Sequence, residues 1–311
     1  MSDPTPHPLA HTDFYREIRR NKWRTAFILL SFVVLIMIAG VAVDLLAGFG
    51  VAGVIGALII AAVLAFISYY NSDKVALAAA HARPADGPEY QRFHNLVEGL
   101  CIAAGLPKPR LYVIDDPAPN AFATGRNPKH AALAVTTGLV QEMNRVELEG
   151  VIAHELSHIK NYDILASTIA VTAVGAIVLL ADLGLRFWIF GGDRDEGAND
   201  GGLGIIVAIA SIALLIFAPI AAQLMQLSMS RKRELLADAT GVQLTRYPPG
   251  LASALKKLES DQSVVHHATR ATAQLWIESP LDRKGEKSSW LNRAFDTHPP
   301  LEERIRILES M

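Results

Sequence analysis

The string HELSH at residues 154–158 has the residue types and the spacing of a zinc hydrolase. It lies in an apolar-periodic stretch that predicts a helix. Residues four apart lie on one face of a helix, so His154 and His158 can bind one metal ion while Glu155 lies beside the remaining coordination position. This geometry suits hydrolysis of a peptide bond by zinc-activated water, with Glu155 as general base and then general acid.

The flanking sequence favours a helix docked at a site. Asn144 can cap this helix, and Glu147 three positions later can complete a capping box. An apolar flank lies beside the polar positions and comprises Val151, Ile152, Leu156 and Ile159. The chain has 10 histidines, so the HELSH spacing could arise by chance. In that case the segment would be an ordinary solvated charged helix.

A zinc hydrolase usually takes three protein ligands and leaves the fourth position to water. Asn161 and Ile164 stand where a metzincin needs glycine and histidine, and no Asp-Gly element within a membrane span, as a site-2 type protease needs, follows His158. The segment SRKRELLAD at 230–238 offers Glu234 as the third ligand and Asp238 as the partner of a ligand histidine. Spacing alone does not exclude the alternative that Glu234 and Asp238 form ordinary surface salt bridges with the basic residues 231–233.

Four motifs together resemble HtpX-type membrane metalloproteases. They are PNAFATGRNPKHAALAVTTGL at 119–139, HELSHIKNYDI at 154–164, SRKRELLAD at 230–238 and THPPLEERI at 297–305. With the flanking apolar segments the resemblance covers most of residues 12–310, and it is weak at 261–290. It implies one zinc ion per chain held by His154, His158 and Glu234, with Glu155 catalytic and Asp238 accompanying the ligands.

The apolar residues, 51% of the chain, are concentrated in runs at 25–47, 51–70, about 164–190 and about 205–224. Each run is long enough to cross a hydrocarbon layer of about 30 Å as a helix. A cleavable signal peptide fits the first run poorly, because its apolar core is too long. We therefore expect four transmembrane helices.

Charge predicts their orientation and the division of the chain. Basic residues precede the first run and follow the fourth, which indicates that both flanks are cytoplasmic. We expect an arm at 1–24, a membrane hairpin at 25–70, a first catalytic part at 71–163, a second hairpin at 164–224 and a second catalytic part at 225–311. Two crossings between His158 and Glu234 would return both to one side of the membrane.

The expected fold class is α+β, mainly α, with a zincin-like (gluzincin-type) catalytic domain beside the membrane helices. The pattern predicts helices at 89–104 and 299–310, and strands at 110–114 and 131–135. The lone Cys101 lies on the apolar face of the first helix, where packing is its expected role.

Two residues are candidates for contact with substrate. Asn120 begins the NAFA string, which resembles the substrate-binding edge strand of thermolysin-like peptidases; a plain turn after Pro119 is the alternative. His298 could steady the tetrahedral oxyanion, or it could cap a helix together with Thr297.

The expected partners are polypeptide substrates, above all damaged or misassembled membrane proteins, and the lipid bilayer. No Walker-type loop and no basic patch away from the membrane occurs, so we expect no ATP and no nucleic acid. The expected location is a bacterial inner membrane, with a role in quality control and stress response. The alternatives are a non-proteolytic zinc-binding scaffold or regulator and a prenyl-protein (CAAX-type) endopeptidase.

Overall fold

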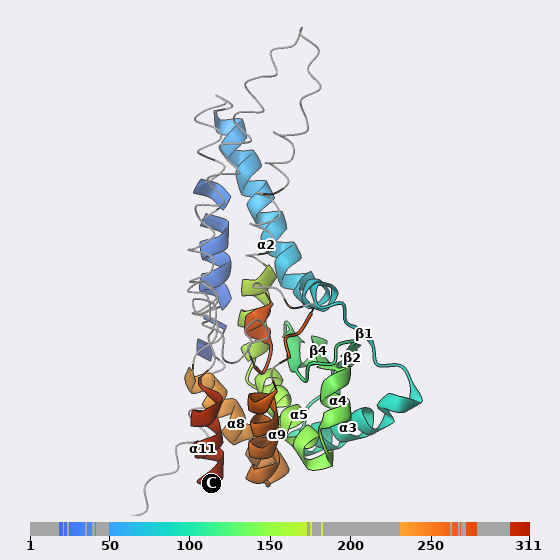
Figure 1. Cartoon of the computed structure of the whole chain (residues 1–311). Coiled ribbons are helices and arrows are strands. Elements are labelled where there is room, and N and C mark those ends of the chain that lie inside the picture. The colour runs from blue at the N-terminus through green and yellow to red at the C-terminus, as the bar shows by residue number, and fades with distance from the viewer. Residues whose placement is uncertain are drawn as a thin grey trace, which may run out of the picture.

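The computed structural model describes residues 19–20, 22–23, 25–34, 36–38, 41, 50–172, 175, 182, 231–261, 263–266, 268, 272–278 and 299–311. In this part of the chain a small mixed sheet is combined with a larger set of helices (Figure 1). The structure thus confirms the mainly helical α+β class.

The sheet has four strands in the order β1, β2, β4, β3. These are β1 (Arg83–Pro84), β2 (Arg110–Ile114), β4 (Ala131–Thr136) and β3 (Ala121–Gly125). β2 and β4 are parallel, whereas β1 pairs with β2 and β3 pairs with β4 in antiparallel fashion. Both predicted strands are present, and β4 is longer than predicted by one residue. Residues of the NAFA string form β3, which lies last in the sheet order.

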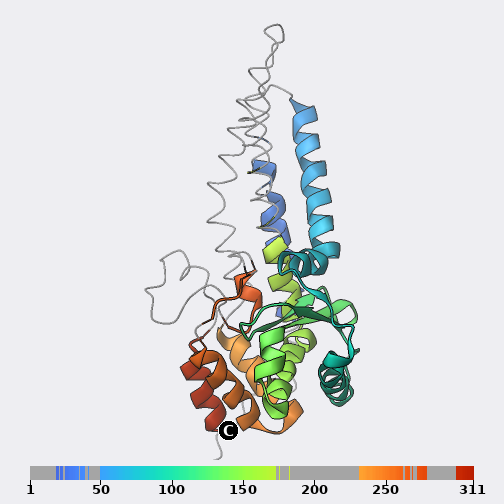
Figure 2. The same cartoon turned by 45° about the vertical axis from the view of Figure 1, so that its right-hand side comes forward.

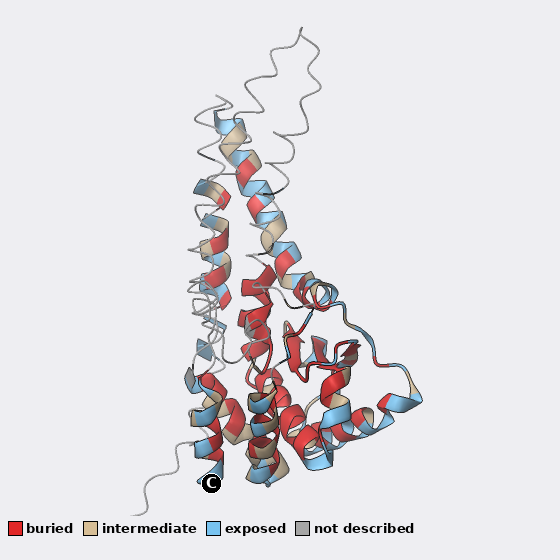
Figure 3. Ribbon diagram, viewed as in Figure 1, coloured by how far each residue is buried: buried red, intermediate tan, exposed pale blue. Residues whose placement is uncertain are grey.

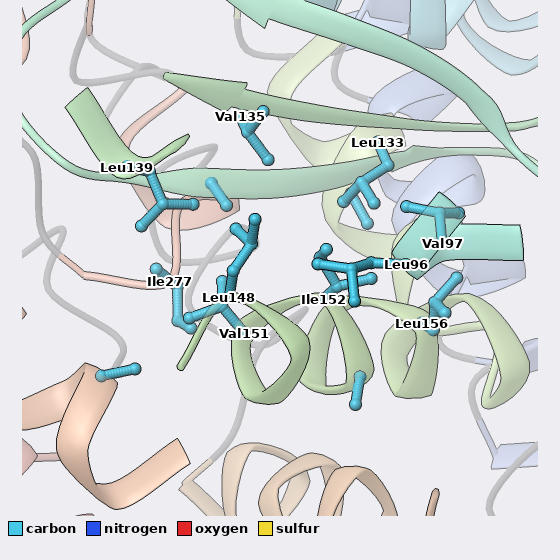
Figure 4. Packing of buried hydrophobic residues seen from close by; sticks show 14 of the residues in the cluster. Leu96, Val97, Leu133, Val135, Leu139, Leu148, Val151, Ile152, Leu156 and Ile277 are labelled. Atoms are coloured by element: carbon cyan, nitrogen blue, oxygen red, sulfur yellow. The ribbon is translucent and has the colours of Figure 1, made fainter. Parts of the chain in front are cut away.

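A hydrophobic core joins one face of the sheet to α3 (Gln91–Ala104) and α5 (Arg145–Lys160). Figure 4 shows side chains of β4 directed toward side chains of α5, with α3 closing one end. The most buried members, each with 0% exposure, include Val97, Leu133, Val135, Val151, Ile152 and Leu156. Each such side chain contributes about 1.5–3 kcal/mol by leaving water. This core fixes α5 beneath the sheet.

The predicted cap of α5 is present. The Asn144 side chain accepts a hydrogen bond from the Glu147 backbone N–H at 3.0 Å, and the Asn144 N–H donates to the Glu147 carboxylate at 2.8 Å. α5 ends at Lys160, and Tyr162 has the left-handed φ of 60°. A second helix, Asp163–Thr172, begins directly after this residue. This break is what allows Asp163 to return beside His158.

A second helical layer lies on the other side of α5 and consists of α8 (Arg231–Thr245), α9 (Pro248–Ser260) and α11 (Leu301–Glu309) (Figures 1 and 2). Two glycines allow the close approach. A Cβ at Gly150 would lie 2.7 Å from the Leu251 nitrogen of α9, and one at Gly241 of α8 would lie 3.1 Å from the His154 nitrogen. Backbones therefore pack directly at the level of the HELSH string. Shorter elements are α4 (Thr137–Glu142) and 3-10 turns at Pro88–Tyr90, Pro128–His130 and Ala273–Leu275.

The helix α2 (Val51–Ala79) is long and apolar enough to cross a membrane. Its 29 residues span about 43 Å at 1.5 Å per residue, more than the hydrocarbon layer of about 30 Å requires. Figure 3 shows that most of its residues are exposed or half-buried, which suits contact with lipid. The run predicted to end at residue 70 continues as helix for nine residues beyond it, to Ala79.

The other predicted spans are described only in part. Residues 25–34 are helical, and Ile28 packs against Leu165, Ala166 and Ile169 of the helix that follows α5. The first and third apolar runs are thus in contact near their first residues. The fourth run, 205–224, lies outside the described residues, so four membrane crossings and their orientation remain predictions.

Candidate active site

α5 carries three of the predicted site residues on its buried side. His154 is 1% exposed, Glu155 2% and His158 8%. The two imidazoles lie one turn apart with their Nε2 atoms 3.1 Å from each other. A pair of nitrogens at this distance can share one small cation, because two ligands of a tetrahedral zinc ion with bonds of 2.0–2.1 Å lie about 3.3 Å apart.

Glu234 approaches the same point from α8. Its carboxylate oxygens lie 3.7 Å from His154 Nε2 and 3.5 Å from His158 Nε2. One ligand atom from each of these three residues lies within 4.8 Å of the others. Glu234 is 0% exposed, so it does not belong to a solvated salt-bridged surface. The donor set of two imidazoles and one carboxylate fits a catalytic zinc site.

Asp238 holds His154 from the outer side of the ring. His154 Nδ1 lies 2.8 Å from Asp238 Oδ1, which leaves Nε2 directed at the candidate metal position. Burial and the charge of Arg304 lower the pKa of His154, which favours the neutral imidazole that binds a metal. Burial alone would raise the pKa of Asp238, but Arg304 and His154 lower it to about 2. The His154 ring is thereby held by a carboxylate that stays ionised.

Arg304 of α11 completes this arrangement. Its guanidinium donates from Nε and Nη2 to the two oxygens of Asp238 at 2.8 and 2.7 Å, and it is 0% exposed. Such a two-point pair fixes the carboxylate plane as well as its charge. Arg304 lies in the THPPLEERI motif, yet the sequence alone gave it no role.

Asp163 plays the corresponding part for His158. Its Oδ2 lies 3.1 Å from His158 Nδ1, and its Oδ1 lies 3.3 Å from Arg233 Nε. Burial would lower the pKa of His158, but Glu234 and Asp163 raise it to about 9, so metal binding has to displace a proton from this ring. Sequence analysis missed Asp163; the available signal was an acidic residue that begins a helix just after HELSH.

The remaining candidates have different outcomes. Asn120 directly precedes β3 and is 3% exposed; its side chain donates to the Glu278 carbonyl at 3.1 Å and accepts from the Ala121 N–H at 3.0 Å. It therefore lies at the sheet edge and is already bonded to another segment of the chain. His298 lies outside the described residues. Burial raises the pKa of Cys101 to about 11, in keeping with a packed, unreactive thiol.

Two histidines one turn apart on a helix under a sheet, joined by a carboxylate from a second helix, are the arrangement of a metallopeptidase. A family model of peptidase family M48 matches residues 88–311. The chain belongs to this family and is of the HtpX type: it is 45% identical to the protease HtpX homolog of Leuconostoc citreum over 96% of this chain and 99% of that protein.

The protease HtpX homolog of Tropheryma whipplei (strain Twist) is 46% identical to this chain, over 96% of this chain and 98% of its own length. The crystal structure of Ste24p from S. mikatae aligns with a TM-score of 0.48 at 17% identity, over 96% of this chain and 67% of that one.

Proposed function

We propose that this chain is an integral-membrane zinc endopeptidase. The observation that carries the proposal is the convergence of His154, His158 and Glu234 on one point, with Glu155 lining the same cavity. A scaffold that only bound zinc would need the three ligands but would not need an acid-base group among them.

The roles of the residues follow from their places. His154, His158 and Glu234 would hold the zinc ion, which when bound supplies Lewis acidity toward water and toward the peptide carbonyl. The Glu155 carboxylate takes a proton from the attacking water and delivers it to the nitrogen of the leaving amine. Asp238 and Asp163 keep the two imidazoles oriented throughout.

The topology proposal places this site close to the membrane. The chain leaves α5 into the helix Asp163–Thr172, which begins the third apolar run, and re-enters the catalytic part at α8. A hairpin at 164–224 would thus join the two metal-binding helices, and the parts 71–163 and 225–311 would form one catalytic domain. The basic flanks favour the cytoplasmic side of a bacterial inner membrane.

We propose damaged or misassembled membrane proteins as substrates, in a quality-control and stress role. The proposal rests on the HtpX-type relationship and on a catalytic part that begins directly at the end of α2. Cleavage of extended, unfolded chains requires recognition of backbone more than of particular side chains, which a sheet edge provides.

The test compares the native protein with Glu155→Gln and Glu234→Ala after purification in detergent. Zinc content and cleavage of an unfolded protein are measured for each. We expect both variants to lose cleavage, while Glu155→Gln alone keeps its zinc. If Glu155→Gln cleaves as fast as the native protein, the mechanism is wrong and a zinc-binding scaffold becomes the better proposal.

A further inference from the structure

A short segment of the chain, residues 275–278, lies along the outer side of β3. Trp276 pairs with Phe122 in antiparallel fashion, and the Ile277 N–H donates to the Ala121 carbonyl at 3.0 Å. One residue further on, the Asn120 amide donates to the Glu278 carbonyl at 3.1 Å. The sheet edge that sequence analysis assigned to substrate is therefore occupied by the protein itself.

The same segment covers the candidate metal site. Leu275, Trp276 and Ile277 line one cavity together with His154, Glu155, His158 and Glu234. This cavity has a volume of about 10 Å³, roughly the space needed for one water molecule. A metal ion or a water fits in this volume, whereas a peptide is far too large for it.

Arg304 connects the segment to the metal ligands. Its Nη1 donates to the Ile277 carbonyl at 3.3 Å and lies 3.7 Å from Glu234 Oε2. The carbonyl of Ile277 thus lies on the side of the strand that faces the reacting groups. Glu155 and Glu234 both line this cavity. The scissile carbonyl of a substrate therefore has to lie on the same side of the strand as the Ile277 carbonyl.

We infer that residues 275–278 occupy the peptide-binding groove as an internal ligand and must leave before a substrate pairs with β3. The substrate backbone then takes over the hydrogen bonds that the segment makes with the Ala121 carbonyl, the Asn120 side-chain amide and the Arg304 guanidinium. The inference rests on the proposed endopeptidase function and adds a regulatory step to it. It also names the substrate class, which is an extended peptide with large apolar side chains.

The side chains of the segment support both parts of the inference. Trp276 is 0% exposed and packs edge-on against Phe122 with ring centroids 4.9 Å apart, so the groove accepts a large apolar group. The indole Nε1 of Trp276 is buried without a hydrogen-bond partner among the described residues. A buried donor without a partner is unfavourable, and this cost is relieved when the segment leaves.

The experiment locks the segment with a disulfide. Phe122 and Trp276 are opposed across an antiparallel pair whose Cα atoms are expected about 4.5–5.5 Å apart, within the range of disulfides. Phe122→Cys/Trp276→Cys is made in a Cys101→Ala background, and each single cysteine variant in that background serves as a control. Disulfide formation, zinc content and cleavage of an unfolded protein are measured before and after reduction.

We expect oxidation to lower cleavage more than about tenfold, because a closed groove leaves little competent enzyme. Reduction should restore cleavage, zinc content should stay equal, and the single variants should not respond. A disulfide that fails to form, or an oxidised protein that cleaves as fast as the reduced one, overturns the inference. If the native protein does not cleave at all, the proposed endopeptidase function falls as well.

A second variant covers the case in which the paired cysteines prevent folding. Ile277→Pro removes the N–H that donates to the Ala121 carbonyl while leaving β3 intact. If the segment is a removable internal ligand, kcat/KM of Ile277→Pro should rise several-fold, because the groove is open more often. If the segment were a permanent strand on which substrate builds, this variant would lose activity or leave it unchanged, and either result overturns the inference.

Discussion

Asp238→Asn should weaken zinc binding although Asp238 does not touch the metal position. One oxygen of Asp238 lies 2.8 Å from His154 Nδ1, and both oxygens accept hydrogen bonds from Arg304. Asparagine replaces one of these acceptors with an NH₂ group, which would face a donor. The imidazole loses its fixed orientation, and Arg304 loses the carboxylate that balances its buried charge.

The two losses have different sizes and different readouts. Loss of such a carboxylate partner of a metal-binding histidine costs about 10- to 100-fold in metal affinity, or roughly 1.4–2.8 kcal/mol. Breaking a fully buried ion pair by removing one partner costs about 3–5 kcal/mol of folding stability. We therefore expect a lower melting temperature together with weaker zinc binding by the protein that remains folded.

The assay is competition with a calibrated zinc chelator, at a temperature where circular dichroism shows the variant folded. Asp115→Asn is the matched control. Asp115 is also held at two points by an arginine, Arg83, but its side chain is 64% exposed. Native zinc affinity in a folded Asp238→Asn protein would refute the reasoning about ligand orientation.

Three further predictions concern helix packing, a helix cap and the metal ion. Gly150→Ala should destabilise the protein by about 1–3 kcal/mol through overpacking against α9. Gly99→Ala is the control: its added Cβ meets nothing within 4 Å, and it should stabilise α3 by up to about 1 kcal/mol. Thermal unfolding of both variants tests this, and equal effects would contradict the close approach of α5 and α9. Glu147→Gln should destabilise the protein at neutral pH: burial raises the pKa of Glu147, but hydrogen bonds from Lys257, Ser253 and the Asn144 backbone N–H outweigh burial and lower it overall. That stabilisation is present above the ordinary pKa of 4.5 and is lost as pH falls through the folded value, so melting temperatures of native and variant should converge in acid. Finally, chelator should abolish cleavage by the native protein, and zinc should restore it; cleavage that resists chelation with zinc removed would count against a metallopeptidase.

Local patterns in the sequence predicted several elements closely. The strand Arg110–Ile114 has the predicted bounds, and α5 begins at the predicted cap. Strand alternation and helix capping depend on neighbours within a few residues, so one chain segment contains the whole signal. The α2 boundary was missed because apolar composition marks contact with lipid, while intrahelical hydrogen bonds let the helix continue through the polar residues 71–74.

The residues that orient the metal ligands could not be predicted in the same way. Arg304 reaches Asp238 from 66 positions away, and which arginine of the closing helix faces inward depends on how α11 packs. Asp163 reaches His158 only because the backbone turns at Tyr162, whose left-handed conformation no pattern indicated.

The sequence by itself determined the chemistry of the candidate centre, since HELSH on a helix fixes two imidazoles and one carboxylate by spacing alone. Tertiary structure decided the rest. The approach of α8, allowed by Gly241, brought Glu234 to the two histidines, and the pairing of residues 275–278 with β3 filled the sheet edge. A pairing of so few residues has no periodicity to detect, because its free energy comes from burial between segments distant in the chain.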